Sequence, residues 1–139
     1  MFYEPKNGIP FKIDPFKSLV FPRPIGWISS ISKNGIANLA PYSYFNAVAD
    51  EPPQVMFCSN GSSAHGKYKN SLSNILSTKE FVVNFVTSSL RNQMNISSRD
   101  FKPDEDEFYF SNLKKKKSKL IRVPSVKDSP VNLECKLVK

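Results

Sequence analysis

The dipeptide Asn34-Gly35 lies between two segments in which apolar residues alternate with small or polar ones. Both central residues of a type I′ turn need a positive φ, and asparagine and glycine adopt that conformation at the lowest cost. The pattern therefore predicts a β-hairpin in which residues 25–31 and 36–44 pair as antiparallel strands. A chain with such a hairpin forms a sheet that is at least partly antiparallel.

The rest of the sequence predicts short helices between strands. Residues 70–79 place Leu72, Ile75 and Leu76 at helical spacing, with Asn70 as the expected N-cap. Residues 88–97 form a second segment with helical spacing. Further strands are expected over residues 52–59, 80–87 and 130–138, whereas residues 100–129 show no regular pattern.

These elements predict a single domain over residues 1–139 with a mainly β, α+β fold. Strands joined by hairpins, with two short helices, favour a small antiparallel barrel with the helices packed outside. Neither a G-x-G-x-x-G fingerprint nor a P-loop motif occurs, which argues against a dinucleotide-binding fold. With one histidine and no G-x-S-x-G motif, no nucleophilic triad is visible, so an enzyme of this sequence would take its chemistry from a cofactor.

The segment from residue 34 to residue 49 carries no charged side chain, although 23% of the chain is charged. It is rich in amides, hydroxyls and rings, among them Asn38, Ser43, Tyr42 and Tyr44. A flat, largely uncharged ring system with amide-like edges is bound by neutral donors and acceptors and by apolar faces. An isoalloxazine is such a ligand, so this segment favours a flavin.

A different environment follows around the predicted start of the helix at residues 70–79. Lys67, Lys69, Ser71 and Asn74 gather there. A phosphate group is held by the N–H groups of a helix start, by hydroxyls and by a cation. The two segments together therefore predict a site for a flavin that carries a phosphate.

The net charge of +8 is unevenly distributed. Residues 100–110 hold five acidic residues and one basic residue, whereas residues 111–139 hold nine basic and two acidic ones, including the lysine run at residues 114–117. A basic run can bind nucleic acid or an anionic surface, but no aromatic residue is interleaved with these lysines to stack on bases. We interpret the run as a solvated loop that faces the acidic stretch, and we predict no specific nucleic-acid partner.

The cysteines and the single histidine give no sign of a metal site. Cys58 and Cys135 lie far apart in the sequence and no Cys-x-x-Cys occurs, which favours a reducing, cytoplasmic location over a disulfide framework. We expect Cys58 to be a buried small hydrophobe and His65 to lie at the surface without a role. No signal peptide and no membrane partner are expected, since the longest apolar runs are too short to cross a bilayer.

Residues 21–57 resemble the flavin reductase-like, FMN-binding split-barrel family, in the branch that includes the reductase component of nitrilotriacetate monooxygenase. That family combines an Arg-Pro stretch leading to a Trp, a turn, an Asn-x-Ala-Pro-aromatic-Ser motif and a strand opened by two prolines. The matching residues are Arg23, Pro24, Ile25, Trp27, Asn34, Gly35, Asn38, Ala40, Pro41, Tyr42, Ser43, Phe45, Pro52 and Pro53. Residues 69–84 and two later segments match in order, with Asn70 and Ser71 where the family has Asp and Thr.

The resemblance implies a split barrel, a homodimer with FMN in each subunit, and NADH or NADPH as hydride donor. Hydride would pass from the nicotinamide to the flavin, so no catalytic acid or base and no metal is implied. A flavin-dependent monooxygenase is implied as a possible acceptor of the reduced flavin. The residues implied to bind the cofactor are Arg23, Asn38, Ala40, Pro41, Tyr42, Ser43, Tyr44, Ser59, Lys69, Ser71 and Asn74, whereas Trp27 is expected in the core.

Family members continue past the strand at residues 130–138 with further strands that close the barrel. We therefore expect the last strands to be missing and the domain to be incomplete at its C-terminus. Two alternatives to an active reductase stay open. One is a non-catalytic flavin-binding electron carrier or remnant on the same fold, and the other is a basic small barrel that binds nucleic acid.

Overall fold

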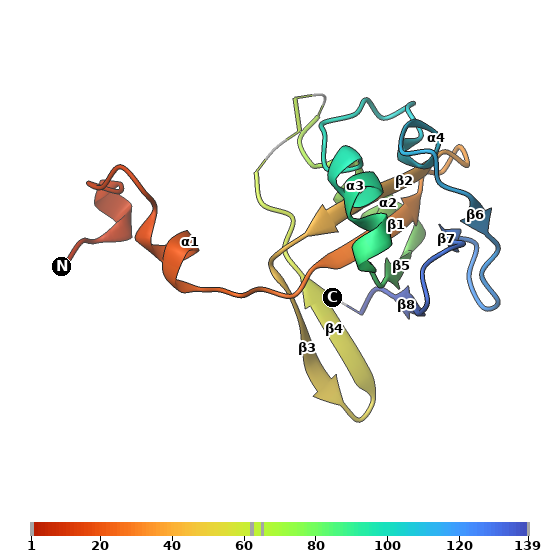
Figure 1. Ribbon diagram of the computed structural model, residues 1–139, viewed down its shortest axis with the longest axis horizontal. Helices are drawn as coiled ribbons and strands as arrows, with labels where there is room; N and C mark the ends of the chain where they lie inside the picture. The colour runs from red at the N-terminus through yellow and green to blue at the C-terminus, as the bar shows by residue number, and fades with distance from the viewer. Residues whose placement is uncertain (1, 62, 65, 139) are drawn as a thin grey trace.

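A four-stranded antiparallel sheet with the strand order β2-β1-β5-β8 forms the centre of the protein (Figure 1). The structure is a computed structural model and describes residues 2–61, 63–64 and 66–138, so His65 lies outside the described residues. The four strands are β1 (Gly26–Ile31), β2 (Ala37–Tyr42), β5 (Glu80–Asn84) and β8 (Asn132–Lys136). In this order β2 and β8 are the edge strands of the sheet.

The predicted hairpin is confirmed as the β1–β2 pair, in which Ile28 faces Ala40. Its turn differs from the predicted type I′ turn, because Gly35 has a φ of +85° while Asn34 is not among the described residues with positive φ. The Gly35 N–H donates to the Ser32 carbonyl at 3.0 Å, and the Ile36 N–H donates to the Ser32 hydroxyl at 3.0 Å. The loop therefore has three residues, with glycine alone in the left-handed conformation.

A second hairpin, formed by β3 (Phe45–Asp50) and β4 (Pro53–Phe57), projects from the body as an arm (Figure 1). β4 lies where a strand was predicted, but β3 was not predicted. Five of the six β3 residues are exposed, so both faces are free of the core and the strand lacks an alternating apolar pattern. The expectation that Cys58 is buried was wrong, because Cys58 follows this exposed arm and is itself exposed.

The helices are short; the first two lie on the N-terminal segment away from the sheet, and the others lie around the sheet (Figure 1). They are η1 (Pro5–Asn7), α1 (Pro15–Leu19), α2 (Asn70–Thr78), η2 (Ser88–Leu90), α3 (Arg91–Ile96) and α4 (Glu107–Phe110). The N-cap of α2 is Lys69 rather than the predicted Asn70, whose amide instead donates to the Phe101 carbonyl at 3.0 Å. Within the described ranges, no helix has both the length and the apolar character needed to cross a lipid bilayer.

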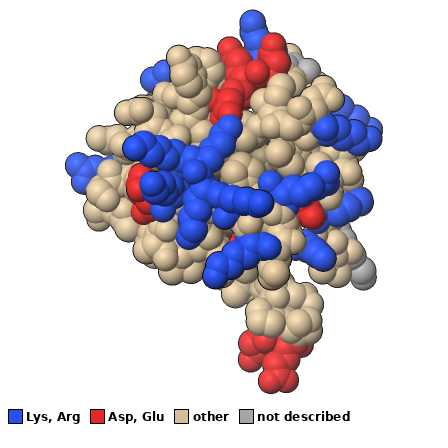
Figure 2. All heavy atoms as spheres, turned by 90° about the vertical axis from the view of Figure 1, so that its right-hand side faces the viewer, with Lys and Arg blue, Asp and Glu red and all other residues tan. Residues whose placement is uncertain are grey.

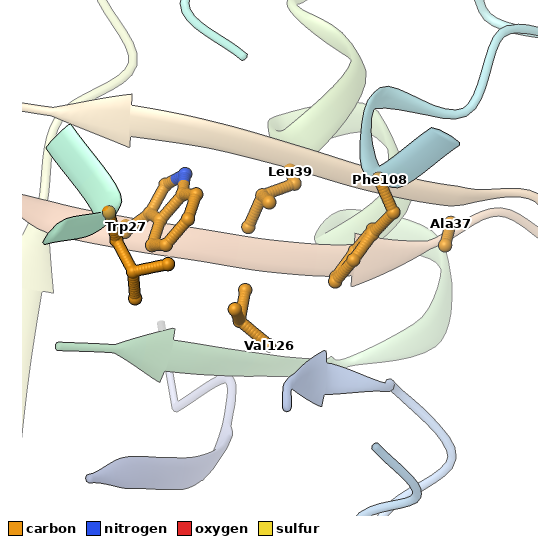
Figure 3. Packing of buried hydrophobic residues seen from close by; sticks show 6 residues of the cluster. Trp27, Ala37, Leu39, Phe108 and Val126 are labelled. Carbon is orange, nitrogen blue, oxygen red and sulfur yellow. The ribbon is translucent and has the colours of Figure 1, made fainter. Parts of the chain in front are cut away.

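The core lies on both faces of the sheet because successive residues of β1 point to opposite sides. Trp27 packs on one face with Leu39, Phe108 and Val126 (Figure 3). Ile28 packs on the other face. Trp27 is fully buried, and its indole N–H donates to the Ser97 hydroxyl at 2.9 Å. The expected core role of Trp27 is therefore confirmed.

Residues 2–25 leave the body as a long N-terminal arm that carries α1 (Figure 1). Its exposed apolar side chains include Phe16, Leu19 and Phe21. Arg23 fixes the base of this arm, since its guanidinium donates to the Val20 carbonyl at 2.7 Å. The same guanidinium lies over the Tyr44 ring, 5.2 Å from its centroid.

The segment at residues 100–129, predicted as irregular, contains α4 and two short strands, β6 (Lys115–Lys116) and β7 (Ser125–Val126). Figure 2 shows lysine and arginine side chains gathered on the side of the molecule that carries β6 and β7. Lys115 forms an ion pair with Asp106, as expected for a lysine run that faces the acidic stretch. The run is therefore partly a strand rather than a loop.

Candidate functional site

A pocket of about 240 Å³ opens where β2, the start of α2, residues 98–101 and α4 meet. Its lining residues are Asn38, Ala40, Pro41, Tyr42, Lys69, Asn70, Ser71, Ser98, Arg99, Asp100, Phe101 and Glu107. Pockets for whole organic ligands commonly measure about 300–1,000 Å³. This pocket is therefore large enough for part of a ligand such as FMN, and the rest of the ligand would lie outside it.

The pocket contains six of the eleven residues predicted to bind the cofactor. These are Asn38, Ala40, Pro41, Tyr42, Lys69 and Ser71. The other five do not line it: Arg23, Ser43, Tyr44, Ser59 and Asn74. Arg23 and Tyr44 contact each other at the base of the N-terminal arm, and Asn74 donates to the Ser30 hydroxyl behind the pocket at 3.2 Å. Their binding roles stay predictions.

One wall of the pocket is uncharged and comes from β2. Pro41 lacks an N–H group and is tolerated here because β2 is an edge strand. The Tyr42 side chain is 7% exposed and packs against Phe57, with ring centroids 4.9 Å apart. Burial raises the pKa of the Tyr42 phenol, although the neighbouring Ser71 and Ser59 hydroxyls oppose this effect. The phenol is therefore neutral at physiological pH and can donate a hydrogen bond.

The opposite side of the pocket suits an anion. Lys69 precedes the first turn of α2, and its carbonyl accepts from the Ser73 N–H at 3.0 Å. The N–H groups of the first turn have no partner within the helix, and the helix dipole adds a partial positive charge. Arg99 supplies a second cation from the segment after α3, which the Asn70–Phe101 hydrogen bond ties to α2.

The floor of the pocket is a buried hydrogen-bond network centred on Asn38. The Asn38 oxygen Oδ1 accepts from the Ser71 hydroxyl at 2.6 Å and from the Ser30 hydroxyl at 3.3 Å. The Asn38 nitrogen Nδ2 donates to Oε1 of Glu107. The second carboxyl oxygen of Glu107 accepts from the Leu39 N–H at 3.2 Å.

Glu107 is only 3% exposed, and its burial raises the pKa of its carboxyl to about 7. The hydrogen bonds from the Leu39 N–H and the Asn38 amide act in the opposite direction, whereas the nearby charge of Asp106 adds to the rise. Burial has the larger effect because removing a carboxylate from water is costly unless a cation compensates it. The carboxyl is thus poised to change its charge near neutral pH.

Ser59 has a buried hydroxyl beside the Tyr42 phenol but makes no well-formed hydrogen bond. A buried polar atom without a partner is unusual in a folded protein. Ser59 does not line the pocket, and its hydroxyl lies next to the Tyr42 phenol, where it opposes the rise of the phenol pKa.

Sequence reasoning missed half of the pocket lining. The residues not predicted are Asn70, Ser98, Arg99, Asp100, Phe101 and Glu107. Most of them lie in the segment from residue 98 to residue 107. This segment has no periodic pattern, and its position depends on tertiary contacts such as the Asn70–Phe101 hydrogen bond. Glu107 in particular is one of five acidic residues in an eleven-residue stretch, where a solvated surface was the simpler interpretation.

Comparisons with known proteins relate the chain to one family. Residues 17–139 match the family model described as "Flavin reductase like domain". An uncharacterized protein of Aquifex aeolicus is 46% identical over 121 residues, which are 87% of this chain and 61% of that protein. The chain thus spans about three-fifths of the length of this curated relative.

Two solved structures share the fold at moderate identity. Nitrilotriacetate monooxygenase component B from Bacillus cereus has a TM-score of 0.86 and 32% identity, covering 100% of this chain and 69% of that one. A 2-nitrobenzoate 2-nitroreductase from Pseudomonas fluorescens has a TM-score of 0.78 and 28% identity, covering 100% and 66%. The predicted antiparallel, α+β split-barrel fold is confirmed by these neighbours.

Proposed function

The chain belongs to the flavin reductase-like family, and from this premise we propose that it binds FMN at the pocket beside α2 and reduces flavin with NADH or NADPH. The observation that carries the proposal is the pairing of an anion site with an uncharged wall in one pocket. The anion site consists of Lys69, Arg99 and the free N–H groups of α2. The uncharged wall consists of residues 40–42. FMN has both an anionic and an uncharged part.

The residues fit the phosphate end of FMN best. A phosphate at the start of α2 would accept from backbone N–H groups and pair with the side chains of Lys69 and Arg99. The isoalloxazine would then extend along Ala40 and Tyr42 towards the open side of the pocket, because the volume of about 240 Å³ does not hold the whole cofactor. The phenol of Tyr42 lines this path, and the hydroxyl of Ser59 lies next to that phenol.

Bound FMN supplies the redox chemistry by accepting a hydride from the nicotinamide. The task of this chain is to hold and orient the two planar ring systems and to keep water away from them. Apart from the buried Glu107, the described lining residues form no pair of groups arranged for acid–base work. This agrees with a reaction in which protein side chains position the cofactor rather than transfer protons to a substrate.

We further propose that a second copy of the chain completes the site. The N-terminal arm and the β3–β4 arm both leave the body and carry exposed apolar side chains, among them Leu19 at 78% and Val48 at 53% exposure (Figure 1). Extended arms with apolar side chains are costly in a monomer, and a two-fold partner can cover the same surface on both subunits at once. The homodimer predicted from the family resemblance is supported by this shape.

The electron acceptor is proposed from one relative. The similar protein of Bacillus cereus is component B of a nitrilotriacetate monooxygenase. By analogy, reduced flavin from this chain would serve a flavin-dependent monooxygenase. The proposal also includes that residues 1–139 form one flavin reductase-like domain and that the protein is located in the cytoplasm.

The direct test of the proposed activity is the consumption of NADH and of NADPH by purified protein with added FMN. We expect saturable consumption of at least one nicotinamide that depends on both the protein and FMN. Purified protein that turns yellow with FMN but consumes neither nicotinamide would support the electron-carrier alternative. Protein that binds no flavin at all would contradict the proposal.

A further inference from the structure

The floor of the pocket contains a carboxyl that the flavin chemistry does not use. Both oxygens of Glu107 are engaged, one by the Asn38 amide and one by the Leu39 N–H, and the side chain is 3% exposed. Glu107 lines the same pocket as Lys69 and Arg99. A buried carboxylate next to a proposed phosphate site would repel the phosphate, because the two charges share a small, poorly solvated space.

The protonation state of Glu107 decides which way the Asn38 amide points. An ionised carboxylate can only accept hydrogen bonds, so Asn38 must turn its NH₂ group towards Glu107. The Asn38 oxygen then faces the Ser71 hydroxyl, which donates to it at 2.6 Å. In this state the Ser71 hydroxyl donates its proton to the hydrogen bond with Asn38 and cannot donate to a ligand in the pocket.

We propose that Glu107 is a positioning residue of the phosphate site, which acts through Asn38 to release the Ser71 hydroxyl when FMN binds. The inference rests on the proposed function. One proton from solvent adds to Oε1 of Glu107, and the new O–H donates to the Asn38 oxygen after the amide has turned over. The Asn38 nitrogen then donates to the oxygen of Ser71, so that the Ser71 O–H points to the phosphate. The turned amide also replaces the 3.3 Å hydrogen bond that the Ser30 hydroxyl donates to the Asn38 oxygen, because the NH₂ group now faces the Ser30 oxygen. The Leu39 N–H keeps its acceptor.

The energetics favour this exchange near neutral pH. Burial raises the pKa of Glu107 to about 7, so protonation there is inexpensive. An anion arriving in the pocket makes the neutral form still more favourable. The charged groups that surround Glu107 come from three places. Lys69 is the N-cap of α2, and Arg99 and Asp100 lie in the segment after α3. Asp106, the N-cap of α4, pairs with Lys115. Tyr42, facing from β2, stays neutral because burial raises its pKa.

The test is a titration of the protein with FMN between pH 7 and pH 9. Lysine, arginine and aspartate do not titrate in this window in model peptides, and the phosphate of FMN is already a dianion above pH 7. We expect the Kd for FMN to rise about tenfold or more from pH 7 to pH 9. The Kd for riboflavin, which lacks the phosphate, should change much less. All proteins carry His65→Ala, so that no histidine contributes to the profile.

Two variants distinguish the positioning role of Glu107 from a general effect of pH on FMN binding. Glu107→Gln keeps an acceptor for Leu39 and offers a permanent donor to Asn38, so its Kd for FMN should be nearly independent of pH. Asp104→Asn removes an exposed carboxylate near α4 and should follow the parent profile. A second readout needs no variant: calorimetry in two buffers at pH 8 should show about one proton taken up per FMN bound.

The outcomes are distinct. Failure of the parent to bind FMN at any pH contradicts the proposed function itself. Binding with the same pH profile in the parent and in Glu107→Gln overturns the positioning role of Glu107. If Glu107→Gln does not fold, calorimetry on the parent decides, and binding without proton uptake at pH 8 overturns the inference.

Discussion

Glu107 and Asn38 are 69 positions apart in the sequence and share a hydrogen bond on the floor of the pocket. This contact joins α4 to β2, and the Leu39 N–H adds a second bond to the same carboxyl at 3.2 Å. A short helix of four residues would not be stable alone. Its place is fixed by Phe108, which is 1% exposed in the core, and by these two hydrogen bonds.

Lys69→Ala should weaken FMN binding about tenfold or more. A charge-assisted hydrogen bond to a phosphate is worth about 1.5–3 kcal/mol, and about 1.4 kcal/mol corresponds to a factor of ten in Kd. The measurement is a fluorescence titration with FMN. Lys67→Ala is the matched control, because Lys67 lies two residues away, does not line the pocket and contacts the Tyr68 ring. Equal dissociation constants for Lys69→Ala and the parent would remove Lys69 from the site.

Glu107→Gln should make the stability of the ligand-free protein less dependent on pH. Because the pKa of Glu107 rises from 4.5 to about 7 on folding, the folded state holds this proton more tightly than the unfolded state. The parent therefore loses stability as pH rises from about 4.5 to about 7, by up to about 3 kcal/mol from this group. Urea denaturation of both proteins at pH 5 and pH 8 measures the difference. An equal change in the free energy of unfolding would show that Glu107 does not titrate in this range.

Leu19→Asp and Phe21→Asp should weaken the dimer. Both side chains are exposed on the N-terminal arm, at 78% and 73%, and a charge there would have to be buried by a partner subunit. Light scattering should give the parent a mass near twice 15.7 kDa and the variants a lower one. Leu120→Asp is the control, since Leu120 is equally exposed but lies on the basic side of the body. A parent mass near 15.7 kDa would contradict the dimer.

The sequence was sufficient to predict the elements that have a strong local pattern. The β1–β2 hairpin, α2 and β5 combine periodic apolar residues with clear turn or loop residues, so their local preference and their final environment agree. The six predicted cofactor residues that line the pocket, such as Ala40 and Lys69, lie on or beside two of these elements. For these residues the position in a predicted element also places them at the pocket, and their binding of the cofactor stays a prediction.

The remaining features depend on tertiary contacts that leave no local pattern. β3 is exposed on both faces, and α4 is only four residues long, so neither has a periodic signature. Arg99 reaches the pocket because a side-chain bond from Asn70 holds the following Phe101 carbonyl against α2. Arg23 was predicted to bind the cofactor. In the structure its Nη1 donates to the Lys17 and Val20 carbonyls at the end of α1, and the binding role stays a prediction.

The lysines at positions 114–117 should not bind a specific nucleic-acid sequence. Lys115 is already paired with Asp106, and the remaining lysines are exposed without neighbouring aromatic residues interleaved in the run. Any attraction to DNA or RNA should be non-specific and should weaken steeply with salt, because it depends on counterion release. Binding to several unrelated oligonucleotides at rising salt measures this. Tight binding of one sequence at physiological salt, lost when all four lysines are changed to alanine, would contradict it.

The central claim is that the pocket beside α2 binds FMN, and the most direct measurement is an equilibrium titration of flavin-free protein with FMN. The account predicts a yellow complex that saturates at about one FMN per chain, and weaker binding of riboflavin, because the contacts at the start of α2 are made to the phosphate. Absence of saturable binding would contradict the claim. Equal affinities for FMN and riboflavin would contradict the assignment of Lys69 and the α2 start to the phosphate.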